Sequence, residues 1–184
     1  TAEEKVISID PAGEGYDAPA DLIWITHPHQ DHTAIERIET QSPDSLIITH
    51  EEALVDGEHR TFELDFVTVE AVEAGNNPNQ DINICVGYIL TLADGISIYI
   101  SKDTSKTEQM TELAERNLDY AFFCSDGRFN MDMEEAIESA TLVGAKHSIP
   151  YHMVPGELFS RERAELFELE NRLIIADGEE IILT

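Results

Sequence analysis

The sequence predicts a single α+β domain in which helices cover β-sheets. Short apolar runs bounded by Gly, Pro, Asp and Asn dominate the first half of the chain, and in the second half such runs alternate with helical stretches. An order of strands first and βα units later is typical of sheets that helices cover. The length of 184 residues, 42% of them hydrophobic, suits one domain with a substantial core, so we expect residues 1–184 to fold as one unit.

The expected strands are short, rich in β-branched or aromatic residues and flanked by turn formers. Asp94-Gly95 between two of them predicts a tight hairpin, since both residues tolerate positive φ. The predicted strands are Val6–Ile9, Leu22–Thr26, Leu46–Thr49, Leu64–Val72, Ile84–Leu92, Ile96–Ser101, Tyr120–Cys124, His147–Tyr151, Leu173–Ala176 and Ile181–Leu183.

Helical segments lie between these strands. Ser105 and Glu108 have the spacing of a capping box, and Asp132 is a favourable N-cap. The predicted helices are a short one after His32 with Ile35 and Ile38 facing inward, one from Ser105 through Arg116, one that follows Asp132, and one from Ser160 through Asn171.

The charge balance is strongly acidic. The chain has 38 acidic and 11 basic residues, a formal net charge of −27 at pH 7. A field of this sign repels phosphate backbones, which argues against nucleic acid as a partner, and no run of about 18 apolar residues is present to span a membrane. Such acidity usually marks a solvated surface, and at this size it is also what a high-salt habitat favours, because salt screens the self-repulsion.

The two cysteines, Cys85 and Cys124, lie inside apolar runs and are interpreted as small core residues rather than a disulfide or a CxxC site. This favours a reducing compartment, and we expect a cytoplasmic location. Because the sequence starts at Thr1 rather than Met, an export signal cannot be judged from it.

The segment His27-Pro28-His29-Gln30-Asp31-His32 contains three histidines and an aspartate directly after an apolar strand. In a continuing strand His27 and His29 share one face, and a turn brings Asp31 and His32 towards the same point. Imidazole and carboxylate groups are ligands for zinc, iron or manganese. The alternative is a polar loop that is rich in histidine by chance.

This H-x-H-x-D-H pattern after a strand resembles the signature of the metallo-β-lactamase superfamily. Two further segments extend the resemblance over residues 5–155: Asp103 ends a strand in a G-D-T-like segment, and His152 follows a late strand as P-x-H. The segment from Phe129 to Ala136 resembles the branch that includes the ascorbate-6-phosphate lactonases.

The resemblance implies a four-layer αββα sandwich with an active site at one edge, and the strand that usually precedes Val6 is missing or very small. It also implies two metal positions. His27 and His29 would hold one metal, Asp31, His32 and His152 would hold the other, and Asp103 would bridge them. The expected cofactor is one or two divalent ions, zinc first, with manganese or iron as alternatives.

Asp31, His32 and Asp103 are the expected catalytic residues. The general reason is that a bound divalent metal lowers the pKa of water and polarises the oxygen of the substrate. Asp31 would alternatively orient the nucleophile if a single metal is bound.

The sequence departs from the superfamily at one ligand. Relatives usually supply a further histidine after the long middle strand, and residues 72–77 contain none, so a mononuclear centre remains an alternative. In the same segment Asn76 or Asn77 is a candidate to hydrogen-bond the substrate or a metal-bound water, with Asn76 the expected substrate-binding residue, although a loop turn at Gly75 is the favoured interpretation. Lys102 replaces the usual glycine before Asp103, as a partner for a substrate anion or as an ordinary exposed lysine.

Arg128 is a second candidate for substrate binding, because its guanidinium could pair with an anion, and a surface ion pair is the competing interpretation. The remaining histidines have no counterpart in the resemblance: His50 and His59 are expected at a strand end and in a solvated turn, and His147 in a structural position.

The expected function is a metal-dependent hydrolase that uses activated water on a small ester, lactone or phosphoester. The alternative is a metal-binding module of the same fold without catalysis, which the missing histidine motivates. The expected partner is a small-molecule substrate. Related lactonase-like proteins often self-associate, so a homo-oligomer is also considered.

Overall fold

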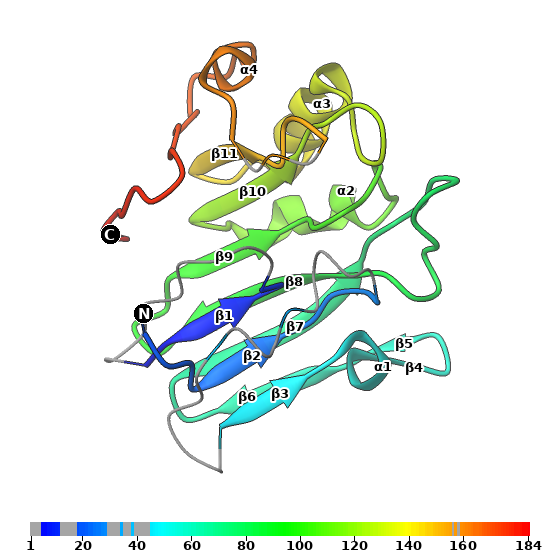
Figure 1. Ribbon diagram of the computed structural model, residues 1–184, viewed down its shortest axis with the longest axis vertical. Coiled ribbons are helices and arrows are strands. Elements are labelled where there is room, and N and C mark those ends of the chain that lie inside the picture. Colours follow the sequence, from blue (N-terminus) through cyan, green and yellow to red (C-terminus); the bar gives the residue numbers. More distant parts are fainter. Residues whose placement is uncertain are drawn as a thin grey trace.

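Two β-sheets form the body of the protein (Figure 1). The computed structural model describes residues 5–11, 18–28, 34, 38, 45–155, 157 and 159–184. The smaller sheet is parallel throughout and has the order β1 (Ile7–Ile9), β2 (Leu22–Trp24) and β3 (Leu46–Ile48). A separate hairpin joins β4 (Leu54–Val55) to β5 (Glu58–His59).

The larger sheet is mixed. Its strands, in spatial order, are β11 (His147–Tyr151), β10 (Tyr120–Cys124), β9 (Ser97–Ile100), β8 (Val86–Leu92), β7 (Val67–Glu73) and β6 (Thr61–Leu64). The strands from β6 to β9 are antiparallel, and β9, β10 and β11 are parallel. The parallel strands therefore all end at the same edge of the sheet.

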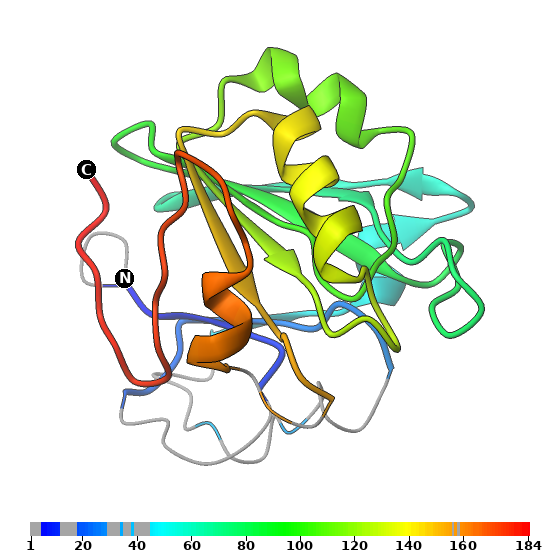
Figure 2. The ribbon, with the colours of Figure 1, turned by 90° about the horizontal axis from the view of Figure 1, so that it is seen from above.

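The helices are short. They are α1 (His50–Ala53), α2 (Met110–Leu113) with a 3₁₀ turn over Ala114–Arg116, α3 (Met133–Val143) and α4 (Arg161–Glu165). Figure 2 shows α2 and α3 on the face of the larger sheet that points away from β1–β3. Among the described residues, no helix is long and apolar enough to cross a membrane.

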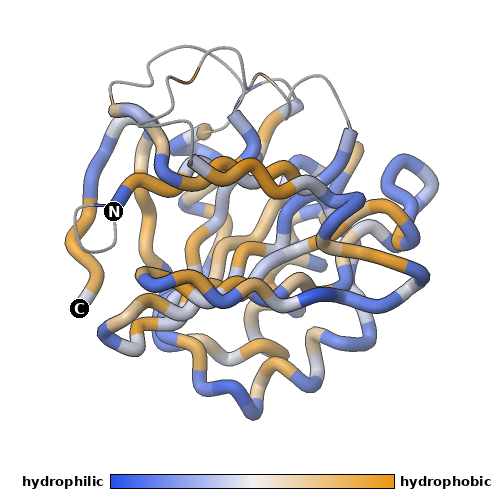
Figure 3. Tube along the Cα trace, turned by 90° about the horizontal axis from the view of Figure 1, so that it is seen from below, coloured by the Kyte–Doolittle hydropathy of each residue, from blue (hydrophilic) through white to orange (hydrophobic). Residues whose placement is uncertain are grey.

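The space between the two sheets is filled by large apolar side chains. The Trp24 ring meets the Tyr88 ring edge to face with centroids 4.6 Å apart, and it meets the Phe62 ring in the same way at 5.2 Å. Edge-to-face contacts between aromatic rings stabilise the packing more than the burial of their surface alone would. Figure 3 shows runs of hydrophobic residues along several extended segments that cross the molecule. This contact between sheets makes the molecule a sandwich, as expected.

The helix-covered face has its own core. Asp132 caps α3 through a hydrogen bond that its side chain accepts from the Glu135 N–H, so the predicted cap is confirmed. The buried side of α3 carries small residues, including Ala136 and Ala140, which let the helix approach the sheet closely. Gly144 ends the helix with a left-handed φ of 63°.

The outer face of the smaller sheet is also covered. Ile23 and Ile25 pack there with Ala20, and Ile38 joins them with only 7% of its surface exposed. This agrees with the prediction that Ile38 faces inward. The helix expected after His32 falls mostly outside the described residues, as does Ile35.

Several predicted boundaries are wrong. The run Leu64–Val72 is a hairpin, because the turn at Asp65-Phe66 separates β6 from β7. The segments Leu173–Ala176 and Ile181–Leu183 form no strands, since a single bridge from Arg172 to Ser148 is the only ladder contact recorded there and Ile182 is 90% exposed.

The helix predicted from Ser105 begins only at Met110. Ser105 is used elsewhere: its N–H donates to the carbonyl oxygen of Gly75, and its hydroxyl accepts from the Asn77 amide. The helix that Ser160 caps ends at Glu165, well before Asn171. The predicted cap at Ser160 is therefore confirmed, whereas the capping box predicted at Ser105 is wrong, because contacts between loops occupy Ser105 and the helix begins later.

Candidate metal centre

Three of the predicted ligands meet at one edge of the sandwich. His27 follows β2, Asp103 follows β9 and His152 follows β11, so all three extend from the carboxyl ends of strands. Asp103 lies between the two histidines: its Oδ1 is 3.1 Å from the Nδ1 of His152, and its Oδ2 is 3.9 Å from the Nε2 of His27. Groups that are far apart in the sequence thus surround one carboxylate.

The orientation of the His27 ring follows from its neighbours. The hydroxyl of Thr26 is 2.6 Å from a carboxylate oxygen of Asp10, which can only accept, so the hydroxyl donates there. The same hydroxyl is 2.9 Å from the Nδ1 of His27 and must therefore accept from an N–H at that nitrogen. This assignment leaves a lone pair on Nε2, the nitrogen that faces Asp103, as a metal ligand requires.

Asp10 is the end of this chain of hydrogen bonds and is paired with a cation. The ammonium of Lys102 is 2.8 Å from its Oδ2, and its Oδ1 accepts from the backbone N–H of Thr26 at 2.8 Å. Lys102 is 7% exposed and adopts a left-handed φ of 56°. The expectation that Lys102 is an exposed lysine or binds a substrate anion is wrong, because its charge is taken up by Asp10.

Asp103 has a further partner that the sequence did not indicate. Gln80, 3% exposed, donates from its Nε2 to the Oδ2 of Asp103 at 3.2 Å, and its Oε1 accepts a weaker contact from the Sγ of Cys85 at 3.6 Å. Burial and the charge of Asp103 raise the pKa of Cys85 to about 12, so the thiol stays protonated. Gln80 lies three residues beyond the segment 72–77, in which the resemblance expects a histidine.

The His152 side is built from a loop. Nδ1 of His152 lies 3.1 Å from the amide nitrogen of Asn130. The carboxylate of Asp126 accepts three backbone N–H groups, those of Arg128, Phe129 and Asn130, at 2.8 to 3.1 Å. The Asp126 carboxylate therefore holds the conformation of the loop that carries Asn130.

The fit to a metal can be judged from the donor set. Two imidazoles and a carboxylate are ligands that zinc, manganese and iron all accept, and the ring of His27 presents the correct nitrogen. Within the part of the chain that the structure describes, no three His, Cys, Asp or Glu side chains are gathered closely enough to form a metal site alone. The other predicted ligands, His29, Asp31 and His32, lie outside the described residues.

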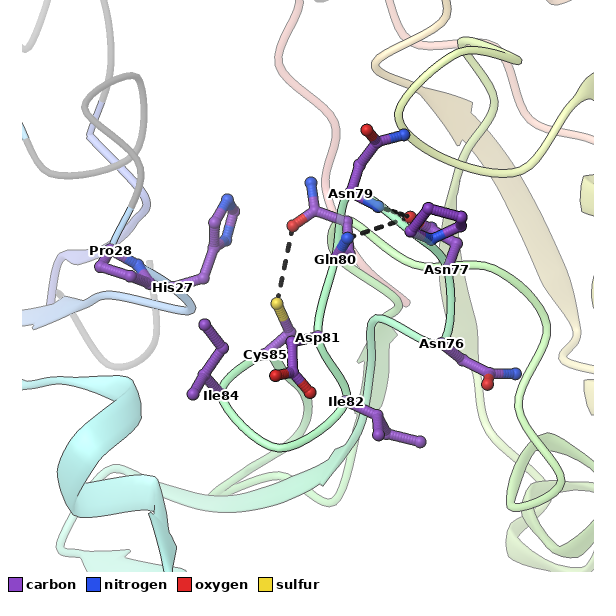
Figure 4. A pocket seen from close by; sticks show the side chains of 11 residues that line it. His27, Pro28, Asn76, Asn77, Asn79, Gln80, Asp81, Ile82, Ile84 and Cys85 are labelled. Atoms are coloured by element: carbon purple, nitrogen blue, oxygen red, sulfur yellow. Dashed lines mark hydrogen bonds between the residues drawn. The ribbon is translucent and has the colours of Figure 1, made fainter.

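A cavity of about 550 Å³ opens beside His27 (Figure 4). Its described walls are His27 and Pro28 on one side and the loop Asn76–Cys85 on the other. Asn76 belongs to this wall, and its amide also donates to the carbonyl oxygen of Lys106 at 2.8 Å. Arg128 does not line the cavity, and its guanidinium lies over the Phe129 ring at 4.9 Å.

The loop that forms this wall is braced internally. Gly75 has φ +94°, and a Cβ there would lie 2.8 Å from the Gln80 carbonyl oxygen, so only glycine fits. The oxygen of the Asn77 side chain accepts the N–H groups of Asn79 and Gln80. The Asn77 nitrogen donates to Ser105 and to the Phe129 carbonyl oxygen. The wall is therefore tied to two neighbouring loops.

Comparison with known proteins agrees with this picture. A family model described as a beta-lactamase superfamily domain matches residues 1–152. A UPF0173 metal-dependent hydrolase of Oenococcus oeni is 28% identical over 174 residues, which cover 80% of this chain and 73% of the relative. A protein of the same name from Geobacillus thermodenitrificans is 31% identical over 176 residues, which cover 80% of this chain and 77% of the relative.

Solved structures share the fold. A crystal structure from Parabacteroides distasonis, of a protein named as a metal-dependent hydrolase, superposes with a TM-score of 0.76 at 27% identity and covers 95% of this chain and 86% of its own. The metallo hydrolase Igni18 of Ignicoccus hospitalis superposes with a TM-score of 0.71 at 18% identity and covers 97% and 91% of the two chains. With the matched residues and the site geometry together, the chain belongs to the metallo-β-lactamase superfamily and is a metal-dependent hydrolase.

Proposed function

We propose that this hydrolase opens small esters, lactones or phosphoesters with water activated at the edge where His27, Asp103 and His152 meet. The observation that carries the proposal is the position of Asp103 between the two histidines, 3.1 and 3.9 Å away. The cavity of about 550 Å³ that adjoins His27 has room for a small substrate. The relatives of this protein are named metal-dependent hydrolases, in agreement with this chemistry.

In this proposal His27 and His29 would hold one divalent ion, Asp31, His32 and His152 would hold a second, and Asp103 would be available to both. Zinc is the first candidate, and manganese or iron are the alternatives. The ion supplies acidified water and polarises the oxygen of the substrate. Asp31, His32 and Asp103 are the residues we assign to catalysis.

The residues behind the ligands have separate tasks. Thr26 keeps a proton on Nδ1 of His27, and Asp10 in turn keeps the Thr26 hydroxyl pointing away from the ring. Gln80 restrains one oxygen of Asp103, which keeps the carboxylate from rotating. Because residues 72–77 contain no histidine, the position held by His27 would have fewer protein ligands and is expected to bind its ion more weakly.

Metal analysis of the purified protein is the first test, with element identity and stoichiometry. Alanine at His27, His32 or Asp103 should remove both bound metal and turnover of a panel of esters, lactones and phosphodiesters. His147→Ala is a matched control, because His147 begins the strand that His152 follows and stacks on Tyr120. Full activity in any of the three ligand variants would contradict the proposal.

A metal-binding module without catalysis is the second candidate, and the absence of a histidine from residues 72–77 favours it. Tight metal binding with no turnover across the substrate panel would support this module. Turnover that rises in proportion to metal content would support the hydrolase.

Kinship with the ascorbate-6-phosphate lactonase branch remains part of the proposal, because it rests on the resemblance of residues 129–136 alone. We also propose a cytoplasmic location, since both cysteines are free and buried. A small molecule is the proposed partner. The charge of −27 disfavours nucleic acid, and the sequence has no run of about 18 apolar residues to span a membrane. Self-association is to be examined by the mass of the protein in solution.

A further inference from the structure

The wall of the cavity beside His27 has a chemical character of its own, and we propose that it selects substrates that are uncharged or cationic and that carry hydroxyl or amine donors. This inference rests on the proposed function and narrows it to esters and lactones without a phosphate or carboxylate substituent. The reacting group would face His27 and Asp103. The rest of the substrate would then face the loop Asn76–Cys85 (Figure 4).

The first argument is the absence of a counter-charge. Among the residues that the structure describes, no lysine or arginine lines the cavity. Lys102 is bound to Asp10, and the ammonium of Lys106 is 2.8 Å from a carboxylate oxygen of Glu138. A phosphate pressed against this wall would lose water without meeting a cation, which is unfavourable.

The second argument is the direction of the Asn79 amide. Its nitrogen donates to the carbonyl oxygen of Arg128 at 3.1 Å. A carbonyl oxygen only accepts, so the nitrogen must face it and the amide oxygen must point elsewhere. Figure 4 shows the Asn79 oxygen on the side nearer His27. The wall therefore offers an acceptor to the substrate at this point.

Asp81 adds a negative charge to the same wall. Its Oδ1 accepts from the backbone N–H and the side-chain amide of Asn83, at 2.9 and 2.7 Å. These hydrogen bonds lower the pKa of Asp81, so the carboxylate is ionised at neutral pH. It repels anions and attracts donors or cations.

The rest of the wall is apolar or already occupied. The side-chain amide of Gln80 is hydrogen-bonded to Asp103 and to Cys85. Ile82 and Ile84 provide hydrophobic surface, and Ile84 is 43% exposed. Acceptors, one negative charge and apolar contact together describe a site for a neutral or cationic substrate of moderate size.

The test uses three γ-butyrolactones that share one ring and carry a hydroxyl, an ammonium or a phosphate ester at the α carbon. Ring opening by the metal-loaded protein is followed in a pH-stat. Each kcat/KM is divided by the rate constant for opening by hydroxide, which removes the electronic effect of the substituent. The hydroxyl and amino lactones should exceed the phosphorylated one by about tenfold or more.

Asp81→Lys should raise kcat/KM for the phosphorylated lactone about fivefold relative to the hydroxyl lactone. Glu63→Lys is the matched control, because Glu63 is an exposed acid on β6, away from the cavity lining. A preference for the phosphorylated lactone, or equal behaviour of the two lysine variants, would overturn the inference while the hydrolase stands. If the metal-loaded protein opened none of the three lactones but hydrolysed other members of the ester, lactone and phosphodiester panel, the inference would fail and the hydrolase would stand. No turnover of any compound in the panel would contradict the proposed function itself.

Discussion

The two sides of the candidate metal centre are held by different means. His27 is 1% exposed, and its ring is oriented through Thr26 by a carboxylate that forms a buried ion pair with Lys102. His152 lies on a loop after β11, where its neighbour Asn130 is held by local hydrogen bonds to Asp126. The His27 side is thus coupled to the packing of the two sheets, whereas the His152 side depends on one loop.

The difference implies that metal binding can be changed without changing folding stability on the His152 side, but not on the His27 side. The Asp10–Lys102 pair joins the segment after β1 in the smaller sheet to the segment after β9 in the larger sheet. Damage there should weaken folding and metal binding together. Damage near Asn130 should weaken metal binding with little effect on folding.

The largest effect is expected from Lys102→Met. It leaves the Asp10 carboxylate buried without its cation, and removal of one partner of a buried pair costs about 3–5 kcal/mol. The free energy of unfolding in urea measures this loss. The double variant Asp10→Asn with Lys102→Met should recover most of it, since no uncompensated charge remains. If the unfolding free energy of Lys102→Met alone lay within about 1 kcal/mol of that of the parent, the proposed difference between the two sides would be contradicted.

Thr26→Val should lower metal affinity about 10–100-fold, because the change removes the hydroxyl that holds the proton on Nδ1 of His27. Competition with a chromophoric chelator gives the affinity. Thr107→Val is the control of equal shape, since the buried hydroxyl of Thr107 has no hydrogen-bond partner among the residues that the structure describes. Equal affinities in the two variants would show that the ring is oriented by packing alone.

Asn130→Ala should reduce metal affinity less than Thr26→Val does, by about tenfold at most. The Asp126 carboxylate still accepts the backbone N–H groups of the loop, so the unfolding free energy should stay close to that of the parent. Both quantities are read in the assays used for the other two variants. A loss of stability comparable to that of Lys102→Met would mean that the two sides are equally coupled to the fold.

The smallest effect concerns His59, on the β4–β5 hairpin and away from both sides of the centre. Burial lowers the pKa of His59 from its ordinary value of 6.5, although the charge of Glu73 opposes this shift. The unfolded chain then binds the proton more readily, so stability should fall as the pH drops through about 6.5. His59→Gln should flatten this slope in thermal melts at pH 5–8, and an unchanged slope would assign it to other groups.

The sequence predicted the parts of the site that carry a local signature. Tyr120–Cys124 and His147–Tyr151 are strands with the predicted boundaries, and the N-cap at Asp132 is confirmed. His27, Asp103 and His152 were proposed as metal ligands from short motifs, and the fold brings their side chains together; their role as ligands stays a prediction. They lie together because β2 of the smaller sheet and β9 and β11 of the larger sheet all end at the same edge of the sandwich.

The remaining contacts could not be read from local patterns. The pairing of Asp10 with Lys102 joins segments that are far apart in the chain, and the sequence around either residue contains no signal that the two interact. Gln80 was missed because a glutamine in an asparagine-rich loop resembles a solvated turn. His59 was expected in a solvated turn and is instead half-buried in β5, a strand that lies against β7, and this long-range packing has no local signature.

The bracing of the cavity wall by Asn77 has a consequence for engineering. Since one side chain ties the loop to Ser105 and to the Phe129 carbonyl oxygen, the loop frame and its outer side chains can be varied independently. A mutant library intended to broaden the range of accepted compounds should randomise Pro78, Ile82 and Ile84 and leave Asn77 untouched. Clones altered only at those outer positions should keep the parental loop conformation. Replacement of Asn77 should release the loop from its neighbours and leave few folded, active clones.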